Sequence, residues 1–222
     1  MDVTEAIRFR NSIRGYKPDP VPKKVLREIL EIASRSPSAN NVQPWDITVV
    51  TGEPLDNIRQ GHIELLTSGT PPNPDFPMKR FEGVYRQRQV DLAIQIFQLM
   101  GIARENRSKR AEWEQRGLRF VDAPAAMILS VDESLSDSDI LLNIGLITQT
   151  ICLAALNYGL GTCIENAGGI YPGVLRTFAG IPESKRIVTS IAIGYPDWNF
   201  PANKLESKRE PVENIATWCG FD

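Results

Sequence analysis

The sequence predicts an α+β protein in which a few short strands form a sheet among helices. Residues 46–52, 125–132 and 186–196 are short runs rich in β-branched and other apolar residues, which is typical of strands. Between them, long segments space their apolar residues as helices do. The chain has 222 residues, 42% hydrophobic and 23% charged, and can therefore bury a large core. We expect a single domain over residues 1–222.

The segments around the first strand can be assigned in order. Residues 1–9 are predicted to form a short amphipathic helix with Val3 on its apolar side. A second helix is expected over residues 22–35, and Pro22 suits its first turn. Residues 61–80 contain four prolines, which predicts a long irregular loop.

The middle of the chain is predicted to be mostly helical. Residues 84–120 follow the proline-rich loop, so the domain carries a helical and loop insertion at about 61–120. Residues 140–160 are apolar on nearly every side of a helix, and such a helix must be buried on nearly every side. It lies either at the centre of the molecule or at a large subunit interface. We favour the interface, which predicts an obligate homodimer.

Composition excludes several classes of function. A pI near 5.6 argues against a nucleic-acid-binding protein, and no apolar run reaches the roughly 18 residues of a membrane span. The first residues lack the apolar core of a secretory signal, and three cysteines without CxxC spacing fit a reduced, cytoplasmic protein. His62 is the single histidine, lies in a polar stretch and is predicted to be at the surface. A hydrolase triad or a histidine-based metal site is therefore not expected.

Cationic residues cluster near the start of the chain, in the stretch RFRNSIRGYKPDPVP at residues 8–22. Arg10, Ser12 and Arg14 stand at two-residue spacing, so in an extended segment they point to one side and can converge on one anion. Lys208 and Arg209 near the C-terminus offer further phosphate partners. The alternative for each group is an ordinary solvated surface.

Two further stretches have the composition of ligand-binding loops. SPSANNVQPW at residues 36–45 combines small residues with side-chain amides, which can read a heterocycle edge that alternates donors and acceptors. Its alternative is a helix cap and turn before a strand. GLGTCIENAGG at residues 159–169 contains four glycines, which permit close approach of the backbone to a ligand. It is not the GxGxxG fingerprint of a dinucleotide-binding fold.

The order of these motifs along the whole chain resembles the nitroreductase family of FMN flavoproteins. The residues that carry the resemblance are RNSIRGYKPDPVP, SPSANNVQPWDITVV, LAALNYGLGTCIENAGG, GIPESKRIVTSIAIGYPD and KREP. Residues 85–125 are most similar to bacterial nitroarene reductases of the nitrobenzoate-reductase kind. The resemblance implies a central, mainly antiparallel sheet flanked by helices, in an intertwined homodimer whose C-terminal segment wraps the partner.

The resemblance also implies roles for the cationic residues. Arg10 and Ser12 would hold the FMN phosphate and the nearby ribityl chain, with Arg209 closing on the phosphate from the C-terminal segment. Arg14 would lie towards the flavin N1 and C2 carbonyl and stabilise the anionic reduced flavin. Ser207 replaces a lysine often found in the family, and Lys208 is the candidate to compensate.

Contacts with the flavin ring are implied for two other groups of residues. Residues of the amide-rich loop would contact the flavin from the partner subunit: Pro37, Ser38, Ala39 and Asn41. Glu165 and Asn166 fall where backbone groups of the family face flavin N5. Trp45 is expected in the core. Asn40 and Asn143 depart from the family pattern, the first where a small residue and the second where an acidic residue is expected.

The implied function is reduction of a small planar aromatic acceptor, nitroaromatic or quinone-like. NADH or NADPH would deliver hydride to FMN and leave before the acceptor binds. The protein would hold the reactants about 3 to 3.5 Å apart and needs no catalytic side chain of its own. Three alternatives remain: the same chemistry with another acceptor (a quinone or flavin reductase, a reductive dehalogenase or an oxidase), an enzyme of this fold that destroys its own flavin, and a flavin-binding module without turnover.

The proline-rich loop carries four large apolar side chains: Phe76, Met78, Phe81 and Tyr85. An exposed loop without a ligand has little reason to bear them. We therefore expect Phe76 and Phe81 to form a lid over the open face of the flavin and to shape the acceptor pocket. The alternative is that these side chains pin the loop to the helices beneath it.

Overall fold

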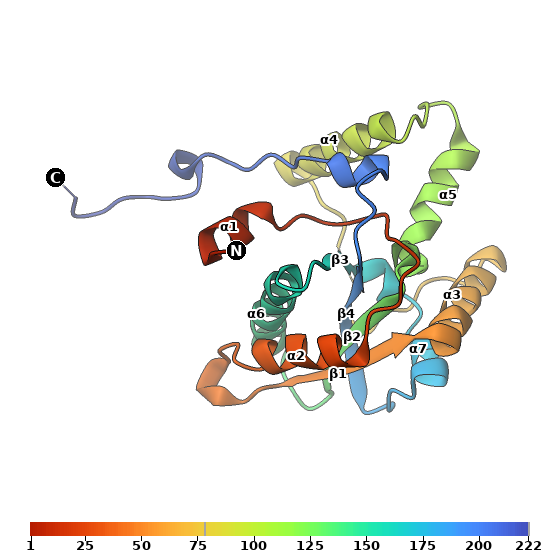
Figure 1. Cartoon of the computed structure of the whole chain (residues 1–222), viewed down its shortest axis with the longest axis horizontal. Coiled ribbons are helices and arrows are strands. Elements are labelled where there is room, and N and C mark those ends of the chain that lie inside the picture. Colours follow the sequence, from red (N-terminus) through yellow and green to blue (C-terminus); the bar gives the residue numbers. More distant parts are fainter. Residues whose placement is uncertain (78, 222) are drawn as a thin grey trace.

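The computed structural model describes residues 1–77 and 79–221 and has an α+β fold, as predicted (Figure 1). Its sheet has four strands in the order β1-β2-β4-β3, and every neighbouring pair is antiparallel. The strands are β1 (Trp45–Thr51), β2 (Ala125–Asp132), β3 (Gly161–Glu165) and β4 (Lys185–Gly194).

Helices surround this sheet. They are α1 (Val3–Phe9), α2 (Lys23–Ala33), α3 (Gly52–Thr67), α4 (Gly83–Leu99), α5 (Arg107–Leu118), α6 (Asp137–Leu156) and α7 (Pro172–Ala179). The short 3-10 helices are η1 (Ala39–Asn41), η2 (Phe120–Asp122), η3 (Asn166–Gly169), η4 (Pro201–Lys204) and η5 (Val212–Asn214). Pro22 was predicted to lie in the first turn of this helix. In the structure it is the N-cap residue of α2, one position before the first helical residue, Lys23.

The core lies on both faces of β2. Met127 and Leu129 pack with α2 and α6 on one face, whereas Ala126 and Ile128 pack with α3 and α7 on the other. Because both faces are covered, β2 is a continuous apolar run and does not alternate between apolar and polar residues. Trp45 is partly buried against the first of these clusters, as predicted.

Two predictions near residue 61 are wrong. The segment 61–67 belongs to α3, and the irregular loop begins only at residue 68 because all four prolines lie at position 71 or beyond. His62 is fully buried and not at the surface. Its Nδ1 lies 2.9 Å from the Leu118 carbonyl oxygen, and its ring lies between those of Phe120 and Tyr171.

Strand β3 was not predicted, because its glycine-rich sequence was interpreted as a ligand-binding loop. Gly161 begins the strand and has no room for a side chain, since Ile13 occupies the space where a Cβ would lie. This glycine therefore serves the close packing of two backbone segments.

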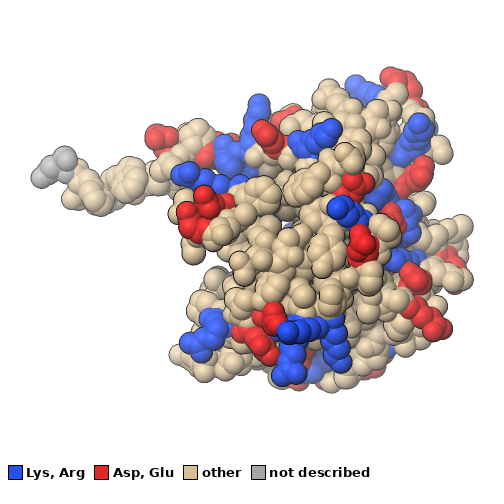
Figure 2. All heavy atoms as spheres, viewed as in Figure 1, with Lys and Arg blue, Asp and Glu red and all other residues tan. Residues whose placement is uncertain are grey.

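Apolar side chains remain exposed on several elements of the single chain. In α6, Ile144 and Ile151 are buried, but Leu141 and Leu142 are 56% and 66% exposed. The C-terminal segment projects from the body of the molecule (Figures 1 and 2), and Trp218 in it is exposed. Among the described residues, no helix is long and apolar enough to cross a membrane.

Candidate functional site

The predicted cation segment lies along β3 at the edge of the sheet. Ser12 forms a parallel bridge with Thr162, and the Ile13 amide donates to the Thr162 carbonyl at 2.9 Å. The segment is therefore extended, as predicted, and Arg10 and Arg14 are half-buried on either side of Ser12. The structure thus places these three residues side by side on the flank of β3.

A buried polar cluster ends β3 next to Arg14. The Cys163 thiol donates to Glu165 Oε1 at 3.0 Å. Burial raises the pKa of Glu165, while the Cys163 hydrogen bond and the Arg14 charge oppose that shift. Burial also raises the pKa of Cys163 well above its usual range, and the Glu165 charge adds to this effect. Arg14 therefore supplies the positive charge that favours an ionised Glu165 in this setting.

The turn after β3 is fixed by two hydroxyl groups of β4. Ser190 donates to the Glu165 carbonyl at 2.6 Å, and Thr189 donates to Asn166 Oδ1 at 2.9 Å. These bonds hold the Glu165 carbonyl and the Asn166 side chain, at the turn whose backbone is expected to face flavin N5. The predicted pair therefore occupies a rigid junction.

A cavity of about 610 Å³ opens between this junction, α6 and the loop before α4. Ile164 lines it and is 44% exposed, although its neighbours in β3 are buried. Thr148 lines it from α6, and its buried hydroxyl has no hydrogen-bond partner among the described residues. Sequence reasoning missed both residues, because each belongs to an apolar stretch in which no local signal marks it.

The amide-rich loop lies at a different place in the single chain. The Ala39 backbone amide donates to Asn143 Oδ1 at 3.0 Å. Asn143 of α6, which stands where an acidic residue was expected, therefore has a structural role. Arg10, by contrast, is close enough to Cys152 for its charge to lower the pKa of that buried thiol, which burial raises. Asn143 and Cys152 are nine positions apart on α6, a rise of about 13.5 Å. One chain therefore holds the loop and the cations near different parts of α6.

Ser36 at the start of this loop is buried, and its other residues are exposed or half-buried. Ser38 Oγ accepts from the Gln43 amide at 3.0 Å, and Asn40 and Asn41 have φ of 48° and 58°. Asparagine tolerates this left-handed backbone better than most residues. Pro37 precedes the turn and is exposed.

The C-terminal cations lie in the exposed segment after η4. Arg209 donates to the carbonyl and the hydroxyl of its neighbour Ser207, and Lys208 is exposed. Glu210 in the same segment forms an ion pair of 2.8 Å with Arg88 of α4. The segment thus runs along α4, and its predicted phosphate contact stays a prediction.

The predicted lid residues differ in their surroundings. Phe76 lines the cavity and is partly buried, with the Arg186 guanidinium 4.0 Å from its ring centre. Asp75 beside it accepts from Arg176 at 2.9 Å, which pins this part of the loop. Phe81 is 49% exposed, and Met78 lies outside the described residues.

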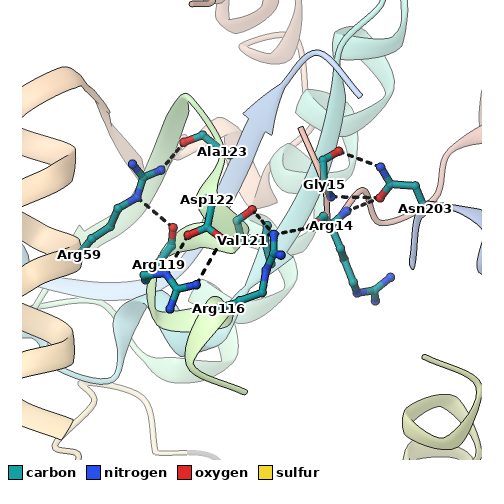
Figure 3. Close-up of polar contacts among 9 residues, drawn as sticks. All are labelled: Arg14, Gly15, Arg59, Arg116, Arg119, Val121, Asp122, Ala123 and Asn203. Atoms are coloured by element: carbon teal, nitrogen blue, oxygen red, sulfur yellow. Dashed lines mark hydrogen bonds and ion pairs between the residues drawn. The ribbon is translucent and has the colours of Figure 1, made fainter. Parts of the chain in front are cut away.

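Arg116 of α5 binds the backbone of the cation segment (Figure 3). Its Nη2 donates to the Arg14 carbonyl at 2.9 Å and to the Val121 carbonyl at 3.1 Å, and it lies 3.2 Å from Asp122 Oδ2. Its guanidinium also lies 4.8 Å from the centre of the Phe200 ring. One side chain thus connects α5, the flank of β3 and η2.

Asn203 of η4 holds the same segment from the other side (Figure 3). Its Oδ1 accepts from the Arg14 amide at 2.6 Å and from the Gly15 amide at 3.2 Å, and its Nδ2 donates to the Gly15 carbonyl at 2.7 Å. The backbone around Arg14 is therefore fixed by two side chains that come from distant parts of the sequence.

The η2 turn has an unusual backbone. Phe120, Val121 and Asp122 all have left-handed φ, at 54°, 46° and 60°. Each such non-glycine residue costs about 1–2 kcal/mol. Arg59 stabilises the turn by donating to the carbonyl groups that flank it, those of Arg119 and Ala123 (Figure 3).

An edge segment bearing two arginines and a serine thus lies next to the Glu165–Asn166 junction and an apolar cavity. Comparison with known proteins specifies the class. The sequence profile described as "Nitroreductase family" matches residues 7–195, so the chain belongs to the nitroreductase family.

Curated relatives are similar over almost their full length. The chain is 30% identical over 220 residues to a nitrobenzene nitroreductase of Ectopseudomonas oleovorans, covering 97% of this chain and 96% of the relative. It is 29% identical to a 4-nitrobenzoate reductase of Pseudomonas putida, covering 100% of this chain and 97% of that protein.

Solved structures of this family have the same fold. A structure described as the FMN and NADPH-dependent nitroreductase NfnB from sphigopyxis sp. strain HMH has a TM-score of 0.95 and 25% identity, with 100% of both chains covered. The FMN-dependent nitroreductase NfnB from Mycobacterium smegmatis, in complex with NADPH, has a TM-score of 0.91 and 26% identity, with 97% of both chains covered.

Proposed function

We propose that this chain is an FMN-dependent NAD(P)H oxidoreductase that reduces nitroaromatic acceptors. The observation that carries the proposal is the alignment of Arg10, Ser12 and Arg14 along β3, which leads to the fixed Glu165–Asn166 junction at the cavity. The named relatives, which are nitroreductases, support the same assignment.

The residues present fit FMN. Arg10 and Ser12 offer a guanidinium and a hydroxyl to a phosphate, and Arg14 offers a cation at the pyrimidine end of the ring. Exposed Ile164 gives an apolar surface for a planar ring, and the unpartnered Thr148 hydroxyl gives the cavity a polar group. FMN, when bound, supplies hydride transfer from the nucleotide to the acceptor.

The protein's own residues would bind the cofactor, orient it and supply a positive charge beside it. The bonds from Ser190 and Thr189 keep the backbone beside the ring from moving. Arg14 would place a positive charge beside the anionic reduced cofactor, and the backbone of Arg14 is held by Asn203 and Arg116. Such preorganised charge favours the reduced state without movement at the time of reaction.

The complete enzyme is proposed to be a cytoplasmic homodimer, in which Pro37, Ser38, Ala39 and Asn41 complete the partner's site. Two observations support this. The loop lies near a different part of α6 from Arg10 in one chain, and Leu141 and Leu142, immediately before the loop's contact at Asn143, expose apolar surface. Exposed Trp218 in the projecting C-terminal segment suits contact with a second copy.

An anaerobic titration tests the proposal. The purified protein is saturated with FMN and titrated with NADPH and with NADH, and the flavin absorbance is followed. We expect the absorbance to bleach with at least one nucleotide and to return when a nitroarene is added. Bound flavin that neither nucleotide bleaches would favour the binding module without turnover. Failure to bind FMN at all would refute the assignment.

A further inference from the structure

A second cavity, of about 710 Å³, lies between α4 and α5. Its wall on α4 is one helical face, because its lining residues repeat every three to four positions. The apolar part of the lining consists of Val90, Ala93, Ile94, Phe97 and Ile102. Its size lies in the range of small-molecule sites.

The polar part of this cavity consists of three arginines, two glutamines and one glutamate. Arg86, Arg104 and Arg110 line it against one acidic residue, Glu114, which leaves a net charge of +2 from three positive and one negative side chains. None of these arginines forms an ion pair with an acidic side chain in the part of the chain that the structure describes. The cavity therefore holds positive charge that the protein itself does not neutralise.

Arg110 is the most constrained of the three. Its guanidinium lies 5.1 Å from the centre of the Phe97 ring, and its Nη1 donates to the Arg104 carbonyl at 3.3 Å. Its Nε is buried and has no hydrogen-bond partner among the described residues. Arg110 therefore lies where the cationic part of the lining meets the apolar wall at Phe97.

We propose that this cavity, which we call the α4–α5 site, binds an aromatic carboxylate. The carboxylate would accept hydrogen bonds from Arg110, with Arg86 and Arg104 adding charge, and the ring would pack on the apolar wall beside Phe97. A neutral arene would leave the cationic side of the cavity without a counter-charge, and an aliphatic anion would leave the wall uncovered.

The α4–α5 site is separate from the FMN site but shares a helix with it. Arg110 and Arg116 are six positions apart on α5, a rise of about 9 Å, and Arg116 binds the Arg14 carbonyl. The C-terminal segment contacts α4 through the Glu210–Arg88 ion pair, and Arg88 does not line the cavity. This contact therefore leaves the cavity unfilled. The structure of the cavity concerns only the aromatic carboxylate. The further inference that this carboxylate also carries a reducible nitro group rests on the proposed function.

Calorimetry without any electron donor tests this site. The purified protein, with and without added FMN, is titrated with benzoate, 4-nitrobenzoate and neutral benzamide. We expect both carboxylates to bind at least tenfold more tightly than benzamide, because a charge-assisted hydrogen bond is lost in the amide. Equal binding of benzoate and benzamide would overturn the proposal. Since no turnover is needed, the result is independent of whether the protein reduces nitroarenes.

Variants locate the binding. Arg110→Gln should weaken benzoate binding by about tenfold to a hundredfold, whereas Lys109→Gln, on an exposed neighbour outside the cavity lining, should leave it unchanged. Should Arg110→Gln destabilise the fold, exposed Arg104→Gln replaces it, with an expected loss of about threefold to tenfold. Benzoate binding that survives both cavity variants but is abolished by Thr148→Val would place the ligand in the other cavity and refute the proposal.

Discussion

Replacing Arg116 with methionine should lower both the stability of the protein and its affinity for FMN. Methionine keeps much of the length and packing of the side chain but removes the donors to the Arg14 and Val121 carbonyl groups. Arg116 is 18% exposed, so water cannot fully replace these bonds. The substitution therefore acts on a buried link between the fold and the site.

The expected magnitude follows from these contacts. Each carbonyl left without its charged donor costs about 1–3 kcal/mol, and the contact with the Phe200 ring adds about 0.5–1 kcal/mol. Asp122 is 43% exposed, so its ion pair adds little. Burial lowers the pKa of Arg116, which shows that burying this charge has a cost that methionine avoids. We expect a net loss of about 2–4 kcal/mol in the free energy of unfolding.

Urea unfolding followed by circular dichroism measures this loss, and fluorescence titration measures FMN binding. The control is Arg107→Met on an exposed residue in the first turn of the same helix. Arg116→Lys keeps the charge but not the forked donors and should lie between the two. Should Arg116→Met match Arg107→Met in unfolding midpoint and in FMN affinity, the reasoning about this link would be wrong.

Three further predictions concern the site and the assembly. Arg10→Ala should weaken FMN binding by about tenfold to a hundredfold, whereas Arg14→Ala should mainly slow flavin reduction in stopped-flow traces; equal effects on affinity with unchanged reduction would show that these roles are misassigned. Because burial raises the pKa of Glu165, the wild type should lose stability as the pH rises through that raised pKa. Glu165→Gln should therefore be the more stable protein at neutral pH and should lose this advantage below about pH 4.5. Urea midpoints of the two proteins that do not diverge with pH would contradict this. Truncation after Leu205 should weaken the dimer in sedimentation analysis without abolishing it, because the apolar surface of α6 remains, and a dimer of unchanged affinity would exclude the C-terminal segment from the interface.

The strands that the sequence predicted are those whose burial shows in their composition. β2 and β4 lie inside the sheet, and their long apolar runs follow from cover on both faces. β3 is short and begins at Gly161, where Ile13 leaves no room for a side chain. A strand that needs glycine for packing has the composition of a loop, so no local pattern reveals its pairing with β4 or the close approach of Ile13, 148 positions away in sequence.

His62 shows a second limit of local composition. Its immediate neighbours are polar, but Leu55, Ile58 and His62 stand at positions i, i+3 and i+7 on the buried face of α3. Helical spacing could therefore have identified it, whereas the composition of the stretch pointed to the surface. The error came from expecting an irregular loop where α3 continues.

The site was predictable to the extent that its chemistry lies in one segment. Arg10, Ser12 and Arg14 lie in one short run beside β3, and the two-residue spacing that predicted them as a group is that of an extended segment. The role of Arg116 could not be inferred in this way, since its bond to Arg14 spans 102 positions and depends on the left-handed turn at Val121. Residues that hold a site through the backbone carry no signature in composition or spacing.

Asn203 shows how one chain can fix its part of the site and still extend a segment towards a second copy. It is buried in η4 and binds the Arg14 and Gly15 backbone, so it anchors the C-terminal region to the cation segment. Leu205, two positions later, is the last buried residue of the described part of the chain, and the exposed segment begins at residue 206. Because the anchor precedes the segment, movement of the segment need not disturb Arg14. The same arrangement allows contact with a partner to leave the charge at the site in place.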